Sequence, residues 1–592
     1  MSMNMLPMRF ERDMTSPTGL EKFVTRVKTS RRTRYVIVGG VVACLVLLYL
    51  VTTGPGGYPT HSPGPWPMED SSGRKGASTG PSQAQRAKRV KSMFVRAYSA
   101  YEQHAFPHDE LLPLSSGHQD NFNGWAVSLV DGLDTMLLMG LNDTVEKATN
   151  HIANLTFDEV RIFPLPYDPT LIGLQDQNVQ FFETVIRYLG GFLSAYTMTG
   201  NNLYLMRADD VARRLLPAFD TPQGLPSFKV NVRTGKPVNG WAGNNAILSE
   251  IASCQMEYRY LAHLTGRPEY VRIVDRITDH LAKTAKGGLL SLSYNLDTGE
   301  PNGDLYSAGA RADSTYEYLL KLWLMTGKTE PQFLDMYLQS ANAIIEHLLF
   351  LSPKRNLLYA TDIWAATYKP VGNFQHLTCF LSGLLALGAA TIPNVDPRHA
   401  WAAEGLAHSC WVSYADSRTG LGPEVMRFDH ERAGRRWAEE VEAWEEAGRP
   451  GGVPPGVNQA VPVEPGEDTE YVVADSQYIL RPETVESFYI LWRTTGDSKW
   501  RERGWAVFEA IEKHAATESA YATVLNVNKV PTSKKNEMPS FFFAETLKYL
   551  YLLFADENPW PLDKWTFNTE AHPFPVFTWS RWEKELFGLQ TQ

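Results

Sequence analysis

Cysteine and the common metal and phosphate motifs are scarce in this sequence. Its 592 residues include 4 Cys, too few for a fold built on disulfides and too few for a structural zinc cluster. The sequence contains no HExxH motif, no Cys/His pair with zinc spacing and no Gly-rich phosphate loop. The signatures of zinc and phosphate-loop chemistry are therefore missing, which leaves carboxylate chemistry and hard cations bound by oxygen ligands.

Positive charge is also in deficit. The chain has 56 Lys and Arg against 66 Asp and Glu, a net charge of −10, which argues against nucleic acid as the main partner. Hydrophobic residues make up 43% and charged residues 21%, a composition typical of a folded chain. Aromatic residues reach 12%, which fits either a large core or a surface that stacks on flat ligands such as sugar rings. Strand signals are weak; the run YATVLNV, from Tyr521, is typical of a minor β-hairpin.

One long apolar run stands out, from Tyr35 to Val51, and it carries no charge. At about 1.5 Å per residue, such a helix spans roughly 26 Å, close to the thickness of a thin bilayer. Eight Lys/Arg and three acids precede it, so the positive-inside rule predicts a cytosolic tail over 1–34 and a luminal remainder. The alternative is a cleaved signal peptide. The long leader and the lack of an A-x-A cleavage site argue against it. The sequence predicts a signal anchor over 35–51.

The chain after the predicted anchor divides into a linker and one long domain. Residues 52–85 are rich in Gly, Pro and Ser, which is typical of a flexible stem. The remainder, 86–592, is interpreted as a luminal catalytic domain. Within it, the charged, Pro/Gly-rich segment 431–470 is interpreted as a surface insertion. Asn142 and Asn154 begin N-glycosylation sequons that a luminal domain would expose to the glycosylation machinery.

A repeated pattern organises the long domain. Seven segments combine a polar or acidic leader with apolar residues at i, i+3, i+4 and i+7, and most end in Gly, a common helix C-cap. The leaders recur about every 63 residues, with one outlier that holds the predicted insertion. Seven helical hairpins of one pattern predict an all-α closed ring of helix pairs with minor β-hairpins. The alternative is a generic helical repeat whose leaders are only N-caps.

A closed ring would bring its equivalent leaders to one end of one cavity. Carboxylates crowded in this way repel one another, so the cluster needs a cation or a function. Paired carboxylates in an aromatic-rich cavity indicate glycoside hydrolysis, with a sugar-binding protein that lacks activity as the main alternative. After Asp134 of the first segment, the leaders are Glu183, Glu250, Asp313, His376, Glu483 and Glu545.

Six motifs in order make the interpretation specific. They are SLVDGLDTMLLMG, FFETVIRYLGGFLSAY, GARADSTYEYLLK, ILRPETVESFYILWRTTGD, FFFAETLKYLYLLF and FNTEAHPFP, and they cover nearly all of the predicted luminal region. The chain resembles the class I α-1,2-mannosidases of glycoside hydrolase family 47. The resemblance implies an (α/α)7 barrel, a bound Ca²⁺ and hydrolysis with inversion at the anomeric carbon.

The resemblance also assigns catalytic roles. Glu183 matches the acid that protonates the leaving oxygen through a water, and Glu483 matches the base that activates the attacking water. Asp313 is the third catalytic carboxylate, and its division of labour with Glu183 stays open. Thr569 matches the residue that binds Ca²⁺ through its hydroxyl and its carbonyl.

The remaining motif residues resemble substrate-binding or supporting positions. Phe541 is equally well explained by core packing, the two arginines by structural ion pairs, and His376 by its place at a helix start. Cys379 and Cys410 match a pair that is disulfide-bonded in the family, and Cys254 is interpreted as a buried free thiol inside a helix. The predicted substrate-binding set is Arg187, Glu250, Arg311, His376, Arg481, Glu486, Phe541, Glu545 and Glu570.

Arg311, in GARADS, resembles the endoplasmic-reticulum branch of the family, where an arginine selects one glycan arm. The predicted activity is removal of one mannose from Man9GlcNAc2, to give Man8GlcNAc2, on high-mannose N-glycans of glycoproteins. The alternatives are a Golgi-type enzyme that trims to Man5 and a glycan-binding lectin of the degradation pathway. We expect a monomeric catalytic domain anchored in the endoplasmic-reticulum membrane, with the cis-Golgi as the alternative location.

Overall fold

The computed structural model describes residues 80–158, 177–428, 434–464 and 466–589. The predicted tail, the anchor over 35–51 and most of the predicted stem lie outside these residues. Within the described ranges, no helix is long and apolar enough to cross a membrane. The described residues belong to one compact unit.

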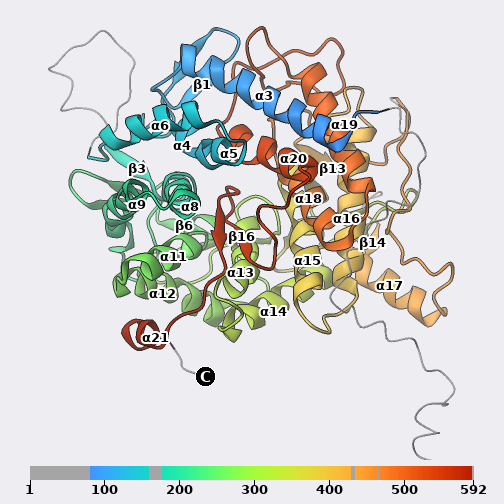
Figure 1. Cartoon of the computed structure of the whole chain (residues 1–592). Coiled ribbons are helices and arrows are strands. Elements are labelled where there is room, and N and C mark those ends of the chain that lie inside the picture. The colour runs from blue at the N-terminus through green and yellow to red at the C-terminus, as the bar shows by residue number, and fades with distance from the viewer. Residues whose placement is uncertain (1–79, 159–176, 429–433, 465, 590–592) are drawn as a thin grey trace, which may run out of the picture. The chain divides into compact units, whose positions relative to one another are not determined.

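Within the described ranges, helices pair seven times around a closed ring (Figure 1). Each inner helix contacts its outer partner, and the inner helices from α5 to α20 contact one another in order; the short helix η4 (Phe542–Thr546), which leads into α20, contacts α5. The N-terminal helix α3 is the outer partner of α20, the last inner helix, so the two ends of the domain close the ring. This confirms the predicted ring of helix pairs. The inner helices are α5 (Leu133–Leu138), α8 (Gly190–Thr199), α11 (Gln255–Thr265), α13 (Asp313–Met325), α15 (Phe380–Thr391), α18 (Glu483–Thr495) and α20 (Leu547–Phe554); in the same order, their outer partners are α6 (Asn142–Asn154), α9 (Asn202–Leu215), α12 (Pro268–Thr284), α14 (Pro331–His347), α16 (Arg398–Ala415), α19 (Lys499–His514) and α3 (Gln83–His104).

Residue patterns explain which helices lie inside. In α13 every residue from Ser314 to Met325 is buried, because this helix packs against neighbours on all sides. The outer helix α12 buries one stripe, which includes Tyr270, Val274 and Leu281, and exposes the opposite face. Helix α3 begins at Gln83, inside the segment predicted as stem, where Ser82 caps it with a capping box.

Short antiparallel strands connect the helices, as the sequence indicates. The hairpin of β16 and β17 contacts α13 and α8 and lies in the middle of the ring (Figure 1). The predicted hairpin at YATVLNV is wrong in detail, since Tyr521 and Val524 form only isolated bridges. The sheets are β1 (Glu110–Leu112) with β2 (Gly117–Gln119); β3 (Asn178–Gln180), β4 (Lys229–Asn231) and β5 (Lys236–Val238); β6 (Asn245–Ile247) with β7 (Ser293–Asn295); β8 (Leu305–Tyr306) with β11 (Ile363–Trp364); β9 (Leu349–Leu351), β10 (Leu358–Ala360) and β14 (Arg435–Arg436); β12 (Asn373–Gln375), β13 (Val425–Arg427) and β15 (Val472–Asp475); and β16 (Trp565–Phe567) with β17 (Pro573–Pro575).

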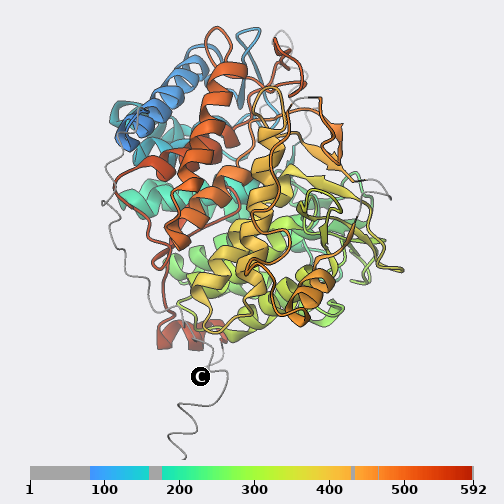
Figure 2. The same ribbon diagram turned by 90° about the vertical axis from the view of Figure 1, so that its right-hand side faces the viewer.

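The described part of the predicted insertion is folded onto the barrel. Its strand β14 pairs with β9, and its helix α17 (Trp437–Glu446) packs on α14 and β9. Trp437 is buried, and its indole N–H donates to the carbonyl of Pro455 at 2.8 Å. The α17 segment (orange) lies at the outer surface in both views (Figures 1 and 2).

The cysteines and sequons occupy defined positions. Cys379 and Cys410 form a disulfide that joins the short helix η3 (His376–Cys379), which precedes α15, to α16. Cys254 is a buried free thiol, but it caps α11 and does not lie inside it. Asn142 and Asn154 are the first and last residues of α6, and both are exposed. Their glycosylation stays a prediction.

Candidate active site

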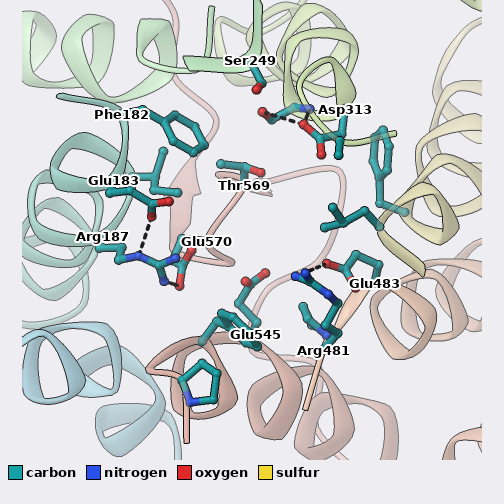
Figure 3. A pocket seen from close by; sticks show the side chains of 18 of the residues that line it. Phe182, Glu183, Arg187, Ser249, Asp313, Arg481, Glu483, Glu545, Thr569 and Glu570 are labelled. Atoms are coloured by element: carbon teal, nitrogen blue, oxygen red, sulfur yellow. Dashed lines mark hydrogen bonds and ion pairs between the residues drawn. The ribbon is translucent and has the colours of Figure 1, made fainter. Parts of the chain in front are cut away.

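A cavity of about 510 Å³ opens in the domain at the end where the inner helices begin (Figure 3). It collects all but one of the predicted catalytic, metal-binding and substrate-binding residues. The exception is His376, which is buried and does not line the cavity. The predicted residues on its wall are Glu183, Arg187, Glu250, Arg311, Asp313, Arg481, Glu483, Glu486, Phe541, Glu545, Thr569 and Glu570.

The catalytic candidates sit at helix starts. Asp313 is the first residue of α13, Glu483 is the first residue of α18, and Glu183 lies in the first turn of α7 (Phe181–Thr184). Helix N-termini favour carboxylates because their backbone N–H groups and dipoles point outward. In Figure 3 the three carboxylates come from different sides of the cavity and surround Thr569.

The turn between β16 and β17 carries Thr569 and Glu570 to the cavity. Asn568 braces this turn from inside, because its side-chain oxygen accepts the backbone N–H groups of Glu570 at 3.0 Å and of His572 at 2.8 Å. Its amide nitrogen donates at 2.8 Å to Glu257, which comes from α11. The turn is therefore fixed to the barrel wall.

A fully buried ion cluster supports the same turn from below. Lys548 Nζ lies 2.8 Å from Asp134 Oδ1 and donates to the carbonyl of Ala571 at 2.7 Å. His572 Nδ1 lies 2.7 Å from Asp134 Oδ2. Burial alone would raise the pKa of Asp134, but the charges of Lys548 and His572 outweigh it and lower that pKa to about 2. The turn thus rests on an ionised carboxylate that contacts Lys548 and His572 and accepts the hydroxyl of Ser194 at 2.8 Å.

Arg187 links one catalytic candidate to the floor. Its Nε donates to Glu183 at 2.8 Å, and its Nη1 contacts Asp131 at 3.1 Å and Glu570. The surrounding carboxylates keep the pKa of the guanidinium above its usual value despite burial. Arg187 therefore both forms structural ion pairs and lines the cavity.

His376 lies behind Glu483. Its Nδ1 is 2.8 Å from Glu483 Oε2, and its Nε2 is 2.6 Å from the Tyr414 hydroxyl. The sequence predicts that His376 binds substrate. Only 2% of His376 is exposed, so its side chain is not placed to contact a sugar in the cavity. The histidine holds the carboxylate, because the backbone of η3 turns the ring toward α18. Arg481 approaches the other oxygen of Glu483 at 4.0 Å.

Asp313 and Glu483 differ in proton affinity. Burial raises the pKa of Asp313 to about 7, and the nearby charges of Glu317 and Glu483 add to the effect. Burial acts on Glu483 too, but the hydrogen bond and charge of His376 and the charge of Arg481 lower its pKa below the usual value. Two carboxyl groups whose environments separate their pKa values are the arrangement expected of an acid and a base.

The floor of the cavity carries an excess of carboxylates. Burial raises the pKa of Glu545 and Glu570 well above the usual value; repulsion from Glu570 and Glu483 adds to it at Glu545. Among the described residues, none donates a hydrogen bond to the hydroxyl or the carbonyl of Thr569, whose N–H faces the Tyr318 hydroxyl at 3.4 Å. This donor set fits a hard cation.

The oxygen donors at the floor do not form a tight cluster of side chains. In the described ranges, no group of three His, Cys, Asp or Glu residues is close enough to hold a metal ion. A cation here would bind the two oxygens of Thr569 directly, and waters would connect it to the carboxylates. Ca²⁺ accepts six to eight oxygen ligands of this mixed kind.

Several residues of the cavity wall are not marked by the motifs or the leader pattern. Glu317 lies one turn after Asp313 and pairs with buried Lys321. The i, i+4 spacing of this pair is visible in the sequence, but the leader pattern covers only helix starts. Glu110 precedes the first helix pair and accepts the backbone N–H of Ser540 at 2.9 Å. No repeat marks that position. Trp241, 70% exposed, forms part of the rim.

Comparisons with known proteins identify relatives of the chain. The chain is 37% identical over 497 residues to mannosyl-oligosaccharide alpha-1,2-mannosidase IA of Spodoptera frugiperda, covering 82% of this chain and 66% of the relative. It is 34% identical over 500 residues to the human endoplasmic reticulum mannosyl-oligosaccharide 1,2-alpha-mannosidase, covering 83% of this chain and 64% of that protein. The chain thus spans about two thirds of the length of these relatives.

A solved structure and a family profile give the same result. The alpha-1,2-mannosidase from Trichoderma reesei superposes with a TM-score of 0.72 at 30% identity, over 84% of this chain and 100% of that one. The profile described as Glycosyl hydrolase family 47 matches residues 93–576. This range contains the seven inner helices, the catalytic candidates and Thr569. The chain belongs to glycosyl hydrolase family 47.

Proposed function

We propose that the protein is a Ca²⁺-dependent, inverting exo-α-1,2-mannosidase that removes one mannose from Man9GlcNAc2 to leave Man8GlcNAc2. The observation that carries the proposal is the pair Asp313 and Glu483, which line the same cavity, with the pKa of one raised and that of the other lowered. The names of the relatives from Spodoptera and human support the substrate class.

The two carboxyl groups suggest a division of labour. Glu483 stays ionised because His376 and Arg481 stabilise its charge, so it serves as the base that takes a proton from the attacking water. Asp313 holds its proton near neutral pH, which favours it as the acid for the leaving oxygen. Glu183, tied to Arg187, would then orient the water that relays this proton. Inversion needs carboxyl groups roughly 6.5–9.5 Å apart, which leaves room for the nucleophilic water.

Thr569 and the acidic floor are proposed to hold Ca²⁺. When bound, the cation would supply Lewis-acid charge for sugar hydroxyls and balance the carboxylates. Glu545 and Glu570 would orient its waters, and Arg187 and Asn568 keep the floor in place. Phe541 is half-buried on the cavity wall, where its ring can stack on the apolar face of the mannose.

Arg311 is the proposed source of arm selection. It is exposed at the cavity rim with φ of 77°, and its carbonyl accepts the N–H of Ser249 at 2.9 Å. Its guanidinium offers several donors to the hydroxyls of a neighbouring glycan arm. We place this activity on glycoproteins in the endoplasmic reticulum, in line with the names of the human and rat relatives. Membrane anchoring through 35–51 and a monomeric catalytic domain remain part of the proposal.

Digestion of Man9GlcNAc2 with and without a chelator tests the activity, with the products separated by chromatography. We expect one Man8GlcNAc2 isomer, and loss of activity when Ca²⁺ is removed. Accumulation of Man5 at ordinary enzyme levels would overturn the role of Arg311 and favour the Golgi-type alternative. Full activity after complete removal of Ca²⁺ would overturn the metal site at Thr569.

The variant Glu483→Gln separates an enzyme from a glycan-binding lectin. The amide cannot accept the proton of the attacking water, so we expect kcat to fall by at least about 100-fold while glycan binding persists. Glu442→Gln, on the exposed face of α17, is the matched control and should keep wild-type turnover. A wild-type protein that binds Man9GlcNAc2 without turnover would instead establish the lectin alternative.

A further inference from the structure

The short sheet of β8 and β11 is close in sequence to a residue that lines the cavity. Strand β8 ends at Tyr306, and the following loop leads to Arg311 on the cavity wall. The N–H of Ala310 donates at 3.0 Å to the side chain of Gln375, which holds this loop. The sheet is thus connected to the arm-selecting arginine by a braced segment of a few residues.

The register of the sheet puts two functional side chains on one face. Ile363 pairs with Tyr306 and is fully buried, so that face points into the domain. Trp364 pairs with Leu305 on the opposite face and is 48% exposed. Asp362, two residues before Trp364, shares its face, about 7 Å away by the rise of a strand. An exposed indole and a half-buried carboxylate therefore lie two residues apart, at Trp364 and just before the strand.

Asp362 joins this face to Arg311. Burial raises the pKa of Asp362, while a hydrogen bond with Ser307 and the positive charge of Arg311 act in the opposite direction. Arg311 is thus close enough to influence this carboxylate. Back along the chain from Arg311 come Ser307, the hydrogen-bond partner of Asp362, and then Leu305, which pairs with Trp364.

Trp364 is held on a rigid support. The backbone N–H of Trp364 donates to the carbonyl of Lys369 at 2.9 Å, and the backbone carbonyl of Trp364 accepts the N–H of Tyr368 at 2.7 Å. The next residue, Ala365, donates to the carbonyl of Asp304 at 2.8 Å. A half-exposed aromatic ring on a hydrogen-bonded turn loses little conformational entropy when a ligand covers it.

We propose that Arg311, Asp362 and Trp364 form an outer subsite that binds a mannose of the glycan arm that is not cleaved. The indole stacks on the apolar face of the sugar ring, and Asp362 accepts hydrogen bonds from its hydroxyls. A single exposed aromatic residue is ordinary on a protein surface. Its shared face with a half-buried carboxylate beside the rim arginine points to a polar, ring-shaped ligand. The inference rests on the proposed function and deepens it.

The test compares two substrates. Man9GlcNAc2 can reach the outer subsite, whereas methyl α-1,2-mannobioside occupies only the cavity. For Trp364→Ala we expect kcat/KM for Man9GlcNAc2 to fall about fivefold to tenfold, mainly through KM, and kcat/KM for the disaccharide to stay within twofold, since one stacking contact contributes about 1 kcal/mol. Trp364→Phe keeps a ring and should recover part of the loss.

The matched control is Trp582→Ala. Trp582 is 61% exposed on α21 (Arg581–Phe587), which packs on α12, and it does not line the cavity. It should leave both substrates unchanged. Equal losses on both substrates, or no loss for Trp364→Ala on Man9GlcNAc2, would overturn the subsite. A wild-type protein that cleaves neither substrate would instead overturn the proposed function.

Discussion

The same functional group has different chemistry at Asp313 and Glu483 because their neighbours differ. Asp313 has the backbone N–H of Ser314 and the repelling charge of Glu317 nearby, whereas Glu483 has His376 and Arg481. The sequence predicts both carboxylates from their helix-start positions. It does not predict which one keeps its proton, because the burial of Asp313 and the contact of Glu483 with His376 depend on segments far apart in the chain.

The pH profile of His376→Ala tests this difference. Glu483 has a lowered pKa, so it is ionised and active as a base down to acidic pH; without the histidine its pKa rises, and the acidic limb of kcat/KM should move to higher pH. The alkaline limb, which we assign to loss of the proton of Asp313 at about 7, should stay in place. Tyr414→Phe keeps the contact of His376 with Glu483 and should shift the acidic limb less. An unchanged acidic limb in His376→Ala would contradict the role of the histidine.

At the scale of elements, the β16–β17 hairpin forms part of the floor of the site, because its turn carries Thr569 and Glu570. Its turn is braced by Asn568 and by the Lys548–Asp134 ion pair, so a loop motif becomes a fixed position in the middle of the ring. The helices that surround it were predictable from periodicity. The place of the hairpin was not, because its contacts with α13 and α8 join segments far apart in the chain.

The disulfide is the second element-scale feature. It closes a separation of 31 residues between η3 and α16, so it restricts the unfolded chain, and Cys379→Ser with Cys410→Ser should lower the free energy of unfolding by about 2–4 kcal/mol. Denaturant titration measures the change. A reductant should lower the midpoint of the wild type and leave that of the double variant unchanged. Equal sensitivity of both proteins to the reductant would contradict the assignment.

At the scale of the whole domain, ring closure depends on α3. Phe94 of α3 packs against Phe543 with the ring centroids 5.3 Å apart, and Val90, Met93 and Tyr101 are buried with it. Each such side chain contributes about 1.5–3 kcal/mol when buried, so together they match the net stability of a typical domain. The closure therefore comes from the N-terminal helix, although the leader pattern places the first repeat later in the chain.

Two truncations test ring closure. A chain that starts at residue 80 keeps every described residue and should fold with an unchanged melting temperature and full activity. A chain that starts at residue 106 lacks α3 and exposes the buried face of α20, so we expect no cooperative thermal transition. Circular dichroism melts measure both. A cooperative, active protein without α3 would show that the ring closes by other contacts.

The sequence by itself determined the helix pairs, their number around the ring and the acidic residues at the helix starts. It could do so because burial and helix periodicity leave a local pattern, and because motifs such as ETVIR and RADS name their residues directly. Only the tertiary structure decided that His376 stands behind Glu483, that the described part of the insertion does not line the cavity, and that Asp362 interacts with Ser307 and Arg311. These relations depend on contacts between distant segments, which local patterns do not record.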